Sequence, residues 1–202
     1  MVEAIFFDFD GVLTLNERGS AVTIRVIQKA NPDLSAEKIR DCYYRFHRQL
    51  LLGEGDHYGI WHDYCKCVGG DIAPAVLTEA FLATPMNAGM LDLAAELAAR
   101  YQLGIITANA TERVTPLVDK HRLNLLFDPI VISAEVGVLK TDALIFESAL
   151  GNRKPEECVI IDNQDRNLTV PARLGFKTSL FDPKQNDIPK LKNQLVEWGV
   201  QI

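Results

Sequence analysis

Short apolar runs alternate with helical patterns along most of the chain. Apolar residues recur at helical spacing in residues 90–101, 168–174 and 188–198, and Thr141 is placed to cap a helix that ends at Leu150. Five runs predict strands, at residues 4–9, 103–107, 129–133, 158–162 and 177–181. Strands that alternate with helices in this way predict an α/β fold, with a parallel sheet and helices on both of its faces.

Residues 15–85 do not follow this alternation. They contain no convincing strand and at least two helical stripes, one of which starts after Ser35 and places Ile39 and Tyr43 on one face. This pattern predicts a helical domain inserted after the first strand. The expected division is a core of residues 1–14 and 86–202 and an inserted domain of residues 15–85.

Two acidic residues stand where the first predicted strand ends. Asp8 and Asp10 are two positions apart, so both carboxylates point to the same end of the sheet, and Gly11 lets the main chain turn beside them. Converging carboxylates repel each other, so a cation or a shared proton is needed to hold them together. The pair is typical of hard-metal and phosphate chemistry, and the longer pattern DxDGVLT argues against a simple acidic turn.

Composition narrows the function classes. The 202 residues, 48% apolar and 24% charged, are enough for one core and a small inserted domain. A net charge of −6 provides no basic surface for nucleic acid or anionic membrane, and no apolar run approaches membrane length. The N-terminus lacks a signal-peptide pattern, and the four cysteines (Cys42, Cys65, Cys67 and Cys158) are expected to be reduced thiols. We therefore expect a cytoplasmic protein that binds neither nucleic acid nor membrane.

The segment from Asp8 to Thr14 resembles the first motif of the haloacid dehalogenase (HAD) superfamily, DxDGxx[TV] at the end of the first strand. The resemblance implies a HAD-like, Rossmann-type fold in which Asp8 is the nucleophile and the helical insert is a cap domain. A second aspartate, as at Asp10, is found in the phosphatases and phosphomutases of the superfamily, whereas its dehalogenases lack it.

Two further motifs of the superfamily have counterparts in this chain. Thr107 matches the second motif and would bind a phosphoryl oxygen; relatives often have Asn directly after it, but here Ala108 precedes Asn109. Lys140 matches the third motif, in a segment similar to vGxxKPdpxiF, and would neutralise charge on the phosphate and on Asp8.

The fourth, acidic motif falls on Asp162 and Asn163, in a segment similar to DDxxxN. The resemblance implies a Mg²⁺ ion held by Asp8, Asp10, Asp162 and Asn163, with Asp10 contributing its main-chain carbonyl. The second position is usually an acid that binds the metal directly. An Asn oxygen can ligate a hard cation but adds no charge, so Asn163 should weaken metal binding.

The resemblance implies a Mg²⁺-dependent phosphatase that hydrolyses a small phosphorylated metabolite through an aspartyl-phosphate. Asp8 would attack phosphorus, and Asp10 would protonate the leaving oxygen and then deprotonate water. The pattern is most similar to small sugar-phosphate phosphatases and to the phosphatase domain of soluble epoxide hydrolases. Two alternatives stay open, a phosphomutase of the β-phosphoglucomutase kind and a HAD-fold binding protein in which Asn163 has impaired catalysis.

Four residues of the expected cap are candidates to face the substrate. They are Arg18, Arg48, His57 and Trp61, although for each one a solvated or core position is the simpler interpretation. The cap carries no pattern from which the substrate can be identified.

Overall fold

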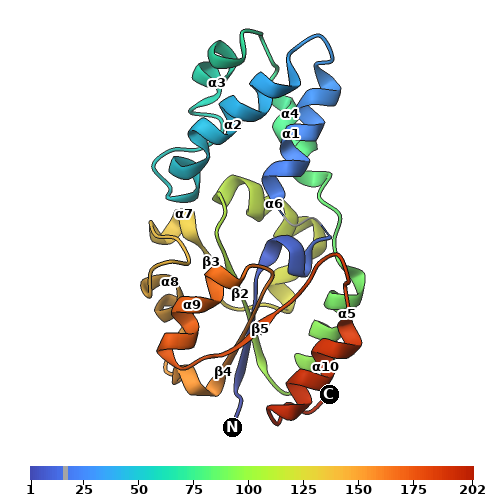
Figure 1. The fold of residues 1–202 in the computed structure, drawn as a ribbon, viewed down its shortest axis with the longest axis vertical. Helices are drawn as coiled ribbons and strands as arrows, with labels where there is room; N and C mark the ends of the chain where they lie inside the picture. The colour runs from blue at the N-terminus through green and yellow to red at the C-terminus, as the bar shows by residue number, and fades with distance from the viewer. Residues whose placement is uncertain (16–17) are drawn as a thin grey trace.

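A five-stranded parallel sheet forms the centre of the molecule (Figure 1). The computed structural model describes residues 1–15 and 18–202. The strands are β1 (Ala4–Phe7), β2 (Gln102–Thr107), β3 (Ile130–Ile132), β4 (Cys158–Asp162) and β5 (Lys177–Leu180), in the order β3-β2-β1-β4-β5. All four residues of β1 are buried, because the strand lies mid-sheet and both sheet faces are covered. The predicted α/β fold is confirmed.

Helices pack on both faces of this sheet. One face is covered by α5 (Ala88–Leu97), α6 (Thr111–His121) and α10 (Ile188–Glu197), and the other by α8 (Leu144–Leu150) and α9 (Asp165–Leu174). The short α7 (Ser133–Val136) follows β3 directly. Alternate residues of β1 serve the two cores: Ile5 and Phe7 face α5 and α6, whereas Phe6 faces α8.

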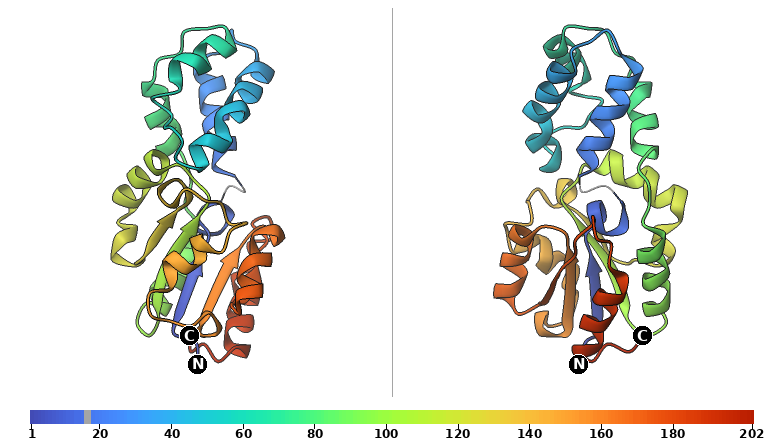
Figure 2. Two further views of the ribbon diagram at one scale, coloured as in Figure 1. Left: turned by 90° about the vertical axis from the view of Figure 1, so that its left-hand side faces the viewer. Right: turned by 45° about the vertical axis from the view of Figure 1, so that its right-hand side comes forward.

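Four further helices form a separate helical unit, the cap, at one end of the sheet (Figures 1 and 2). They are α1 (Gly19–Ala30), α2 (Ala36–Leu51), α3 (Trp61–Val68) and α4 (Ala75–Leu82), and they enclose an apolar core of their own. Ser35 caps α2 as expected, accepting a hydrogen bond from the Lys38 N–H. The two connections to the sheet domain run side by side, where Thr14 pairs with Met86. Residues 15–85 remain our proposed extent of the cap.

Several predicted boundaries differ from the structure. The first strand ends at Phe7, because the chain turns at Phe9–Leu13 (η1) to bring Asp10 back beside Asp8. Thr141 does not cap a helix: α8 begins at Leu144, whose N–H bonds to the carboxylate of Asp142. Outside the expected helical insert, the main omission is α6, where Pro116 interrupts a pattern that is otherwise helical.

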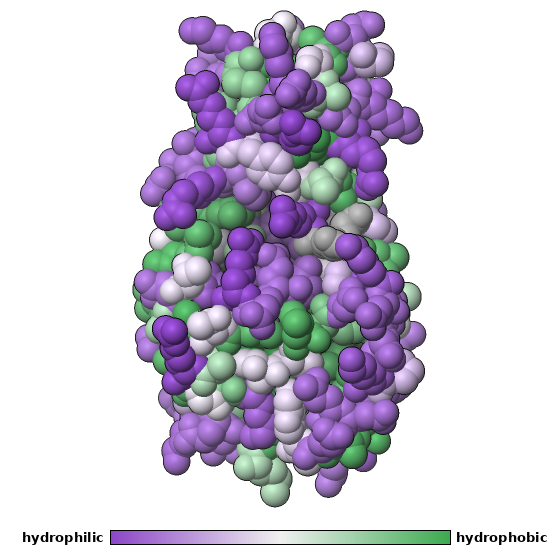
Figure 3. All heavy atoms as spheres, in the orientation of Figure 1, coloured by the Kyte–Doolittle hydropathy of each residue, from purple (hydrophilic) through white to green (hydrophobic). Residues whose placement is uncertain are grey.

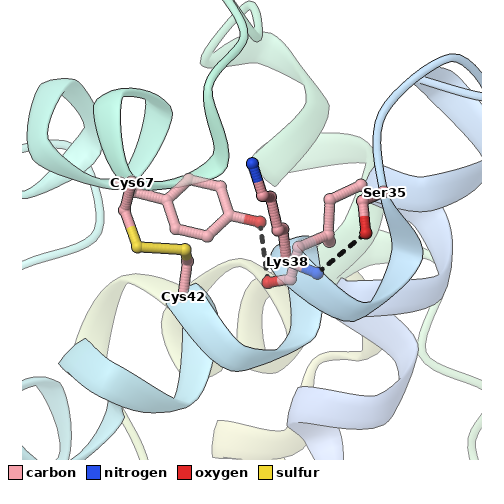
Figure 4. Close-up of a disulfide and its surroundings, with 6 residues drawn as sticks. Ser35, Lys38, Cys42 and Cys67 are labelled. Carbon is pink, nitrogen blue, oxygen red and sulfur yellow. Dashed lines mark hydrogen bonds between the residues drawn. A yellow bond between two sulfur atoms is a disulfide. The ribbon is translucent and has the colours of Figure 1, made fainter.

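The expectation of four reduced cysteines is wrong for two of them. A disulfide joins Cys42 of α2 to Cys67 of α3 (Figure 4). Cys65 and Cys158 are free thiols. On α3, Cys65 and Cys67 point in different directions: Cys67 pairs with Cys42, whereas the Cys65 thiol donates to the Ile72 carbonyl at 3.7 Å. The pairing links residues 25 positions apart and depends on how α3 packs on α2.

The outer face of the cap in Figure 3 is covered mainly by hydrophilic side chains. Within residues 1–15 and 18–202, every helix is too short or too polar to cross a bilayer.

Candidate active site

Asp8, Lys140 and Asp162 form one buried ionic cluster at the carboxyl end of the sheet. Asp8 follows β1, Asp162 ends β4, and Lys140 lies in the loop between α7 and α8. The Lys140 ammonium donates to Asp8 Oδ1 and to Asp162 Oδ2, both at 2.7 Å. Both distances are typical of charge-assisted hydrogen bonds. The structure therefore brings together three residues that are far apart in the sequence.

Burial dominates the electrostatics of this cluster. It raises the pKa of Asp8 to about 7; Lys140 opposes this effect, whereas Asp162 and Asp10 add to it. For Lys140, burial alone would lower the pKa, but the two carboxylates raise it above the ordinary lysine value. Lys140 is therefore a fixed cation at the base of the site, within reach of an anionic group bound to Asp8.

Both carboxylate oxygens of Asp162 accept hydrogen bonds within the protein. In addition to the bond from Lys140, its Oδ1 accepts hydrogen bonds from the Gln164 N–H at 2.8 Å and the Asn167 amide at 3.1 Å. Asn167 also donates to Oδ2 at 3.2 Å. This network holds the carboxylate in one orientation, so Asp162 in turn orients Lys140. By contrast, Asp8 Oδ2 accepts no hydrogen bond from any residue in the described part of the chain.

Asp10 faces the opposite side of the site, toward α6. Arg113 donates to both of its oxygens, from Nη2 to Oδ1 at 2.8 Å and from Nη1 to Oδ2 at 2.9 Å. The amide of Asn109 donates to the same Oδ2 at 2.9 Å. Arg113 is not among the residues predicted from the sequence, although it lies only four positions after Asn109.

Asn109 also links Asp10 to Thr107. Its amide donates to Thr107 Oγ1 at 3.0 Å, and its own carbonyl accepts from Arg113 Nη1 at 2.8 Å. The displacement of Asn from position 108 to 109, noted in the sequence, thus places its side chain inside the site. Thr107 is buried at the end of β2, as expected for a residue at the mouth of the sheet.

Asn163 packs directly against the turn that follows Asp10. Gly11 has a φ of 82°, and a Cβ there would overlap the side-chain amide of Asn163. The close approach brings the amide beside the Asp10–Gly11 main chain. Asp8, Asn163 and this main chain thus offer carboxylate, amide and carbonyl oxygens, the donor set that hard cations prefer.

These donors fit a magnesium ion held by neutral oxygens as well as by a carboxylate. Among the described residues, no group of three or more His, Cys, Asp or Glu side chains is arranged to hold a metal. A cation at this site would therefore rely on the neutral oxygens of Asn163 and the main chain as well as on Asp8. The role of Asp162 would be less direct, because both of its oxygens already accept hydrogen bonds.

A cavity of about 210 Å³ lies above these groups, between the cap and the sheet domain. Its walls include Asp8, Asp10 and Thr107 from the sheet domain, together with Arg18, Tyr44 and His47 from the cap. Burial lowers the pKa of His47 to about 4, with His57 and Arg113 adding to the effect, so this imidazole is neutral near pH 7. The positive charge at the cavity rim comes from Arg18 and from Arg166 of α9.

The other cap candidates lie elsewhere. His57 is buried between cap and core, where its main-chain N–H donates to Glu112 Oε1 of α6 at 2.8 Å and its Nδ1 donates to the same carboxylate. Trp61 packs in the cap core against Tyr64. Arg18 is thus the one of the four candidates that lines the cavity, and Arg48 is exposed.

The capped α/β architecture and its paired aspartates correspond to a known class of hydrolases. A family model for haloacid dehalogenase-like hydrolases matches residues 2–175, and the chain belongs to this family. The resemblance stated from the first motif is thereby confirmed.

Individual relatives are distant. The chain is 24% identical over 179 residues to a glyceraldehyde 3-phosphate phosphatase of Methanothermobacter thermautotrophicus, covering 81% of this chain and 78% of that protein. A HAD-like family hydrolase from Porphyromonas gingivalis superposes with a TM-score of 0.75 at 23% identity, over 96% and 98% of the two chains. A HAD family enzyme from Bacteroides thetaiotaomicron, solved with magnesium and inorganic phosphate, gives a TM-score of 0.70 at 16% identity, over 89% and 94%. Both solved structures share the fold of this chain.

Proposed function

We propose that this protein is a Mg²⁺-dependent phosphatase that hydrolyses a small phosphorylated metabolite through an aspartyl-phosphate on Asp8. The observation that carries the proposal is the position of Asp8. Its Oδ1 is held by buried Lys140, while Asp8 itself lines a cavity shared with Asp10 and Thr107. The phosphatase relative from Methanothermobacter, although distant, supports the same reaction class.

In the first step, an oxygen of Asp8 attacks phosphorus and the bond from phosphorus to the leaving oxygen breaks. Asp10 gives a proton to that oxygen, and the alcohol departs. Lys140, which is bonded to Asp8 Oδ1, and the hydroxyl of Thr107, a residue of the cavity wall, would stabilise the charge on the phosphoryl oxygens. The cation, when bound by Asp8, Asn163 and the Asp10 carbonyl, would reduce repulsion between the anionic substrate and Asp8.

In the second step, water attacks phosphorus of the aspartyl-phosphate and gives its proton to Asp10. This releases inorganic phosphate and restores the Asp8 carboxylate. Asp10 lines the cavity together with Asp8, as this exchange of roles requires. The guanidinium groups of Arg18 and Arg166 line the same cavity and would favour anionic substrates.

Release of phosphate tests the proposal. The substrates are p-nitrophenyl phosphate and a panel of sugar and short-acid phosphates, with and without Mg²⁺. We expect metal-dependent turnover that falls by more than about 1,000-fold in Asp8→Asn, which removes the nucleophile. The matched control is Asp165→Asn, an exposed carboxylate at the start of α9, which should retain turnover.

Other outcomes would identify the alternatives. Activation by a trace of a bisphosphorylated sugar, with transfer to sugar instead of water, would indicate a phosphomutase. A folded protein without turnover on any phosphate ester would contradict the proposal and favour a binding protein. Release of halide from a 2-haloacid would contradict it as well.

A further inference from the structure

Arg113 is a buried cation that none of the four sequence motifs includes. It stands in the first turn of α6, and only 2% of its surface is exposed. Helix α6 itself lies directly under the cap (Figures 1 and 2). The guanidinium of Arg113 donates hydrogen bonds to both oxygens of Asp10 and to the side-chain carbonyl of Asn109. Such two-point pairing fixes the plane of a carboxylate in a way that a single donor cannot.

The guanidinium is held in place from the cap side. A Cβ on Gly19, the first residue of α1, would overlap it, and Nη2 lies 3.5 Å from the hydroxyl of Thr84. Gly19 begins the first helix of the cap and Thr84 follows the last one, so each stands at one of the two junctions between cap and sheet domain. Arg113 therefore contacts Asp10 and both junctions at once.

Packing alone is a poor explanation for this residue. Burying a guanidinium is costly unless all of its N–H groups find acceptors. The Nε of Arg113 is buried and has no acceptor in the described part of the chain. The two terminal nitrogens, in contrast, are directed at Asp10. Both oxygens of Asp10 thus receive hydrogen bonds, whereas one N–H group of Arg113 is left without an acceptor in the described part of the chain.

We propose that Arg113 is a positioning residue that fixes the carboxylate of Asp10 for proton transfer. The inference rests on the proposed function, in which Asp10 is the acid and base. Oδ2 accepts two hydrogen bonds, from Arg113 and Asn109, whereas Oδ1 accepts one, from Arg113. Because a carboxylate oxygen offers two lone-pair sites, Oδ1 keeps one for the proton. Oδ1 is therefore the oxygen that exchanges the proton with the leaving group and with water.

The test compares two leaving groups in single-turnover experiments with Mg²⁺. An alkyl phosphate needs a proton on its leaving oxygen, but p-nitrophenyl phosphate does not, because p-nitrophenolate is a stable anion. The main variant is Arg113→Lys, which keeps the charge but loses the two-point grip, with Arg113→Met as a second variant. The matched control is Arg153→Lys, a partly buried arginine that donates to the Leu150 carbonyl, away from the cavity.

We expect Arg113→Lys to slow transfer from the alkyl phosphate by about 10-fold or more, and transfer from p-nitrophenyl phosphate by much less. Arg113→Met should show a larger difference in the same direction, and Arg153→Lys none. In an Asp10→Asn background, replacing Arg113 should have little further effect, because the two residues act as one unit. Thermal unfolding of each variant separates loss of folding from loss of positioning.

Equal losses on both substrates, or losses that add to those of Asp10→Asn, would overturn the inference and leave Arg113 a structural residue. The wild-type rates distinguish this failure from a failure of the proposed function. Wild-type turnover combined with equal losses rejects the role of Arg113 alone. Absence of wild-type turnover on either phosphate rejects the phosphatase and this role together.

Discussion

At Gly11 the main chain turns with a φ of 82° directly after Asp10, and the side chain of Asn163 fills the space where a Cβ would stand. Both features depend on the missing side chain. The turn directs Asp10 toward Arg113, and the close approach places the side-chain amide of Asn163 beside the main chain that would help to hold a cation. A single position therefore supports both the proton-transfer group and the proposed metal site.

Gly11→Ala should reduce both stability and activity. The left-handed backbone costs an L-residue about 1–2 kcal/mol, and overlap with Asn163 adds a cost of about 1–3 kcal/mol. The matched control is Gly69→Ala, because Gly69 has the same φ of 82° but no atom within 4 Å of an added Cβ. Denaturant unfolding and phosphate release measure the two effects. Equal destabilisation by the two substitutions would contradict the overlap.

The first turn of α6 joins the two parts of the molecule. Glu112 binds His57 of the cap, and the next residue, Arg113, binds Asp10. This helix is absent from the elements predicted from the sequence, because Pro116 lies inside it. The apolar spacing of Val114, Leu117 and Val118 was the signal that could have identified it, since all three are buried against the sheet.

The contact between Glu112 and His57 should make the stability of the protein sensitive to acid. Burial alone would raise the pKa of Glu112, but hydrogen bonds from the side chain and main chain of His57 lower it below the usual value of 4.5. A carboxylate whose pKa is lower in the folded state stabilises the protein above the unfolded pKa. That stabilisation is lost as the pH falls through the folded pKa.

Glu112→Gln should therefore lower the melting temperature by about 2–4 °C at pH 7, and the difference from wild type should shrink below about pH 4. Asp119→Asn, at an exposed position near the other end of α6, is the control and should have little effect. The expectation is checked by thermal unfolding of the three proteins between pH 3 and 8, at intervals of about one pH unit. A difference in melting temperature that stays constant across this range would show that the contact does not depend on the charge of Glu112.

On the scale of the whole molecule, the cavity is a joint product of cap and sheet domain. Tyr44 and His47 come from α2, whereas Gln164 and Arg166 come from the segment after β4. With a volume of about 210 Å³, the cavity has the size of a small metabolite and not of a polymer segment. Entry of a larger substrate would require the cap to separate from α6, to which it is bound through Glu112.

Substrate size should therefore decide turnover. We expect free phosphoserine, or a three-carbon phosphate of similar size, to be hydrolysed with a kcat/KM at least about 100-fold higher than that of a peptide containing the same phosphoserine. The two phosphoserine substrates carry the same reacting group, so the comparison isolates the size of the leaving alcohol. Comparable values for both would show that the cavity does not limit access.

Patterns along the chain were enough to predict the sheet, the insertion of a helical cap and the family. They also marked the candidate site residues, which are Asp8, Asp10, Thr107, Lys140, Asp162 and Asn163. These inferences were possible because strand ends, turn glycines and motif residues are local patterns. Their functional roles stay predictions. Three features are visible only in the folded molecule: the pairing of Arg113 with Asp10, the disulfide from Cys42 to Cys67 and the placement of Arg18 at the cavity. Each of these joins residues from separate elements, so the partner of a charge or a thiol depends on how helices pack, which no local pattern records.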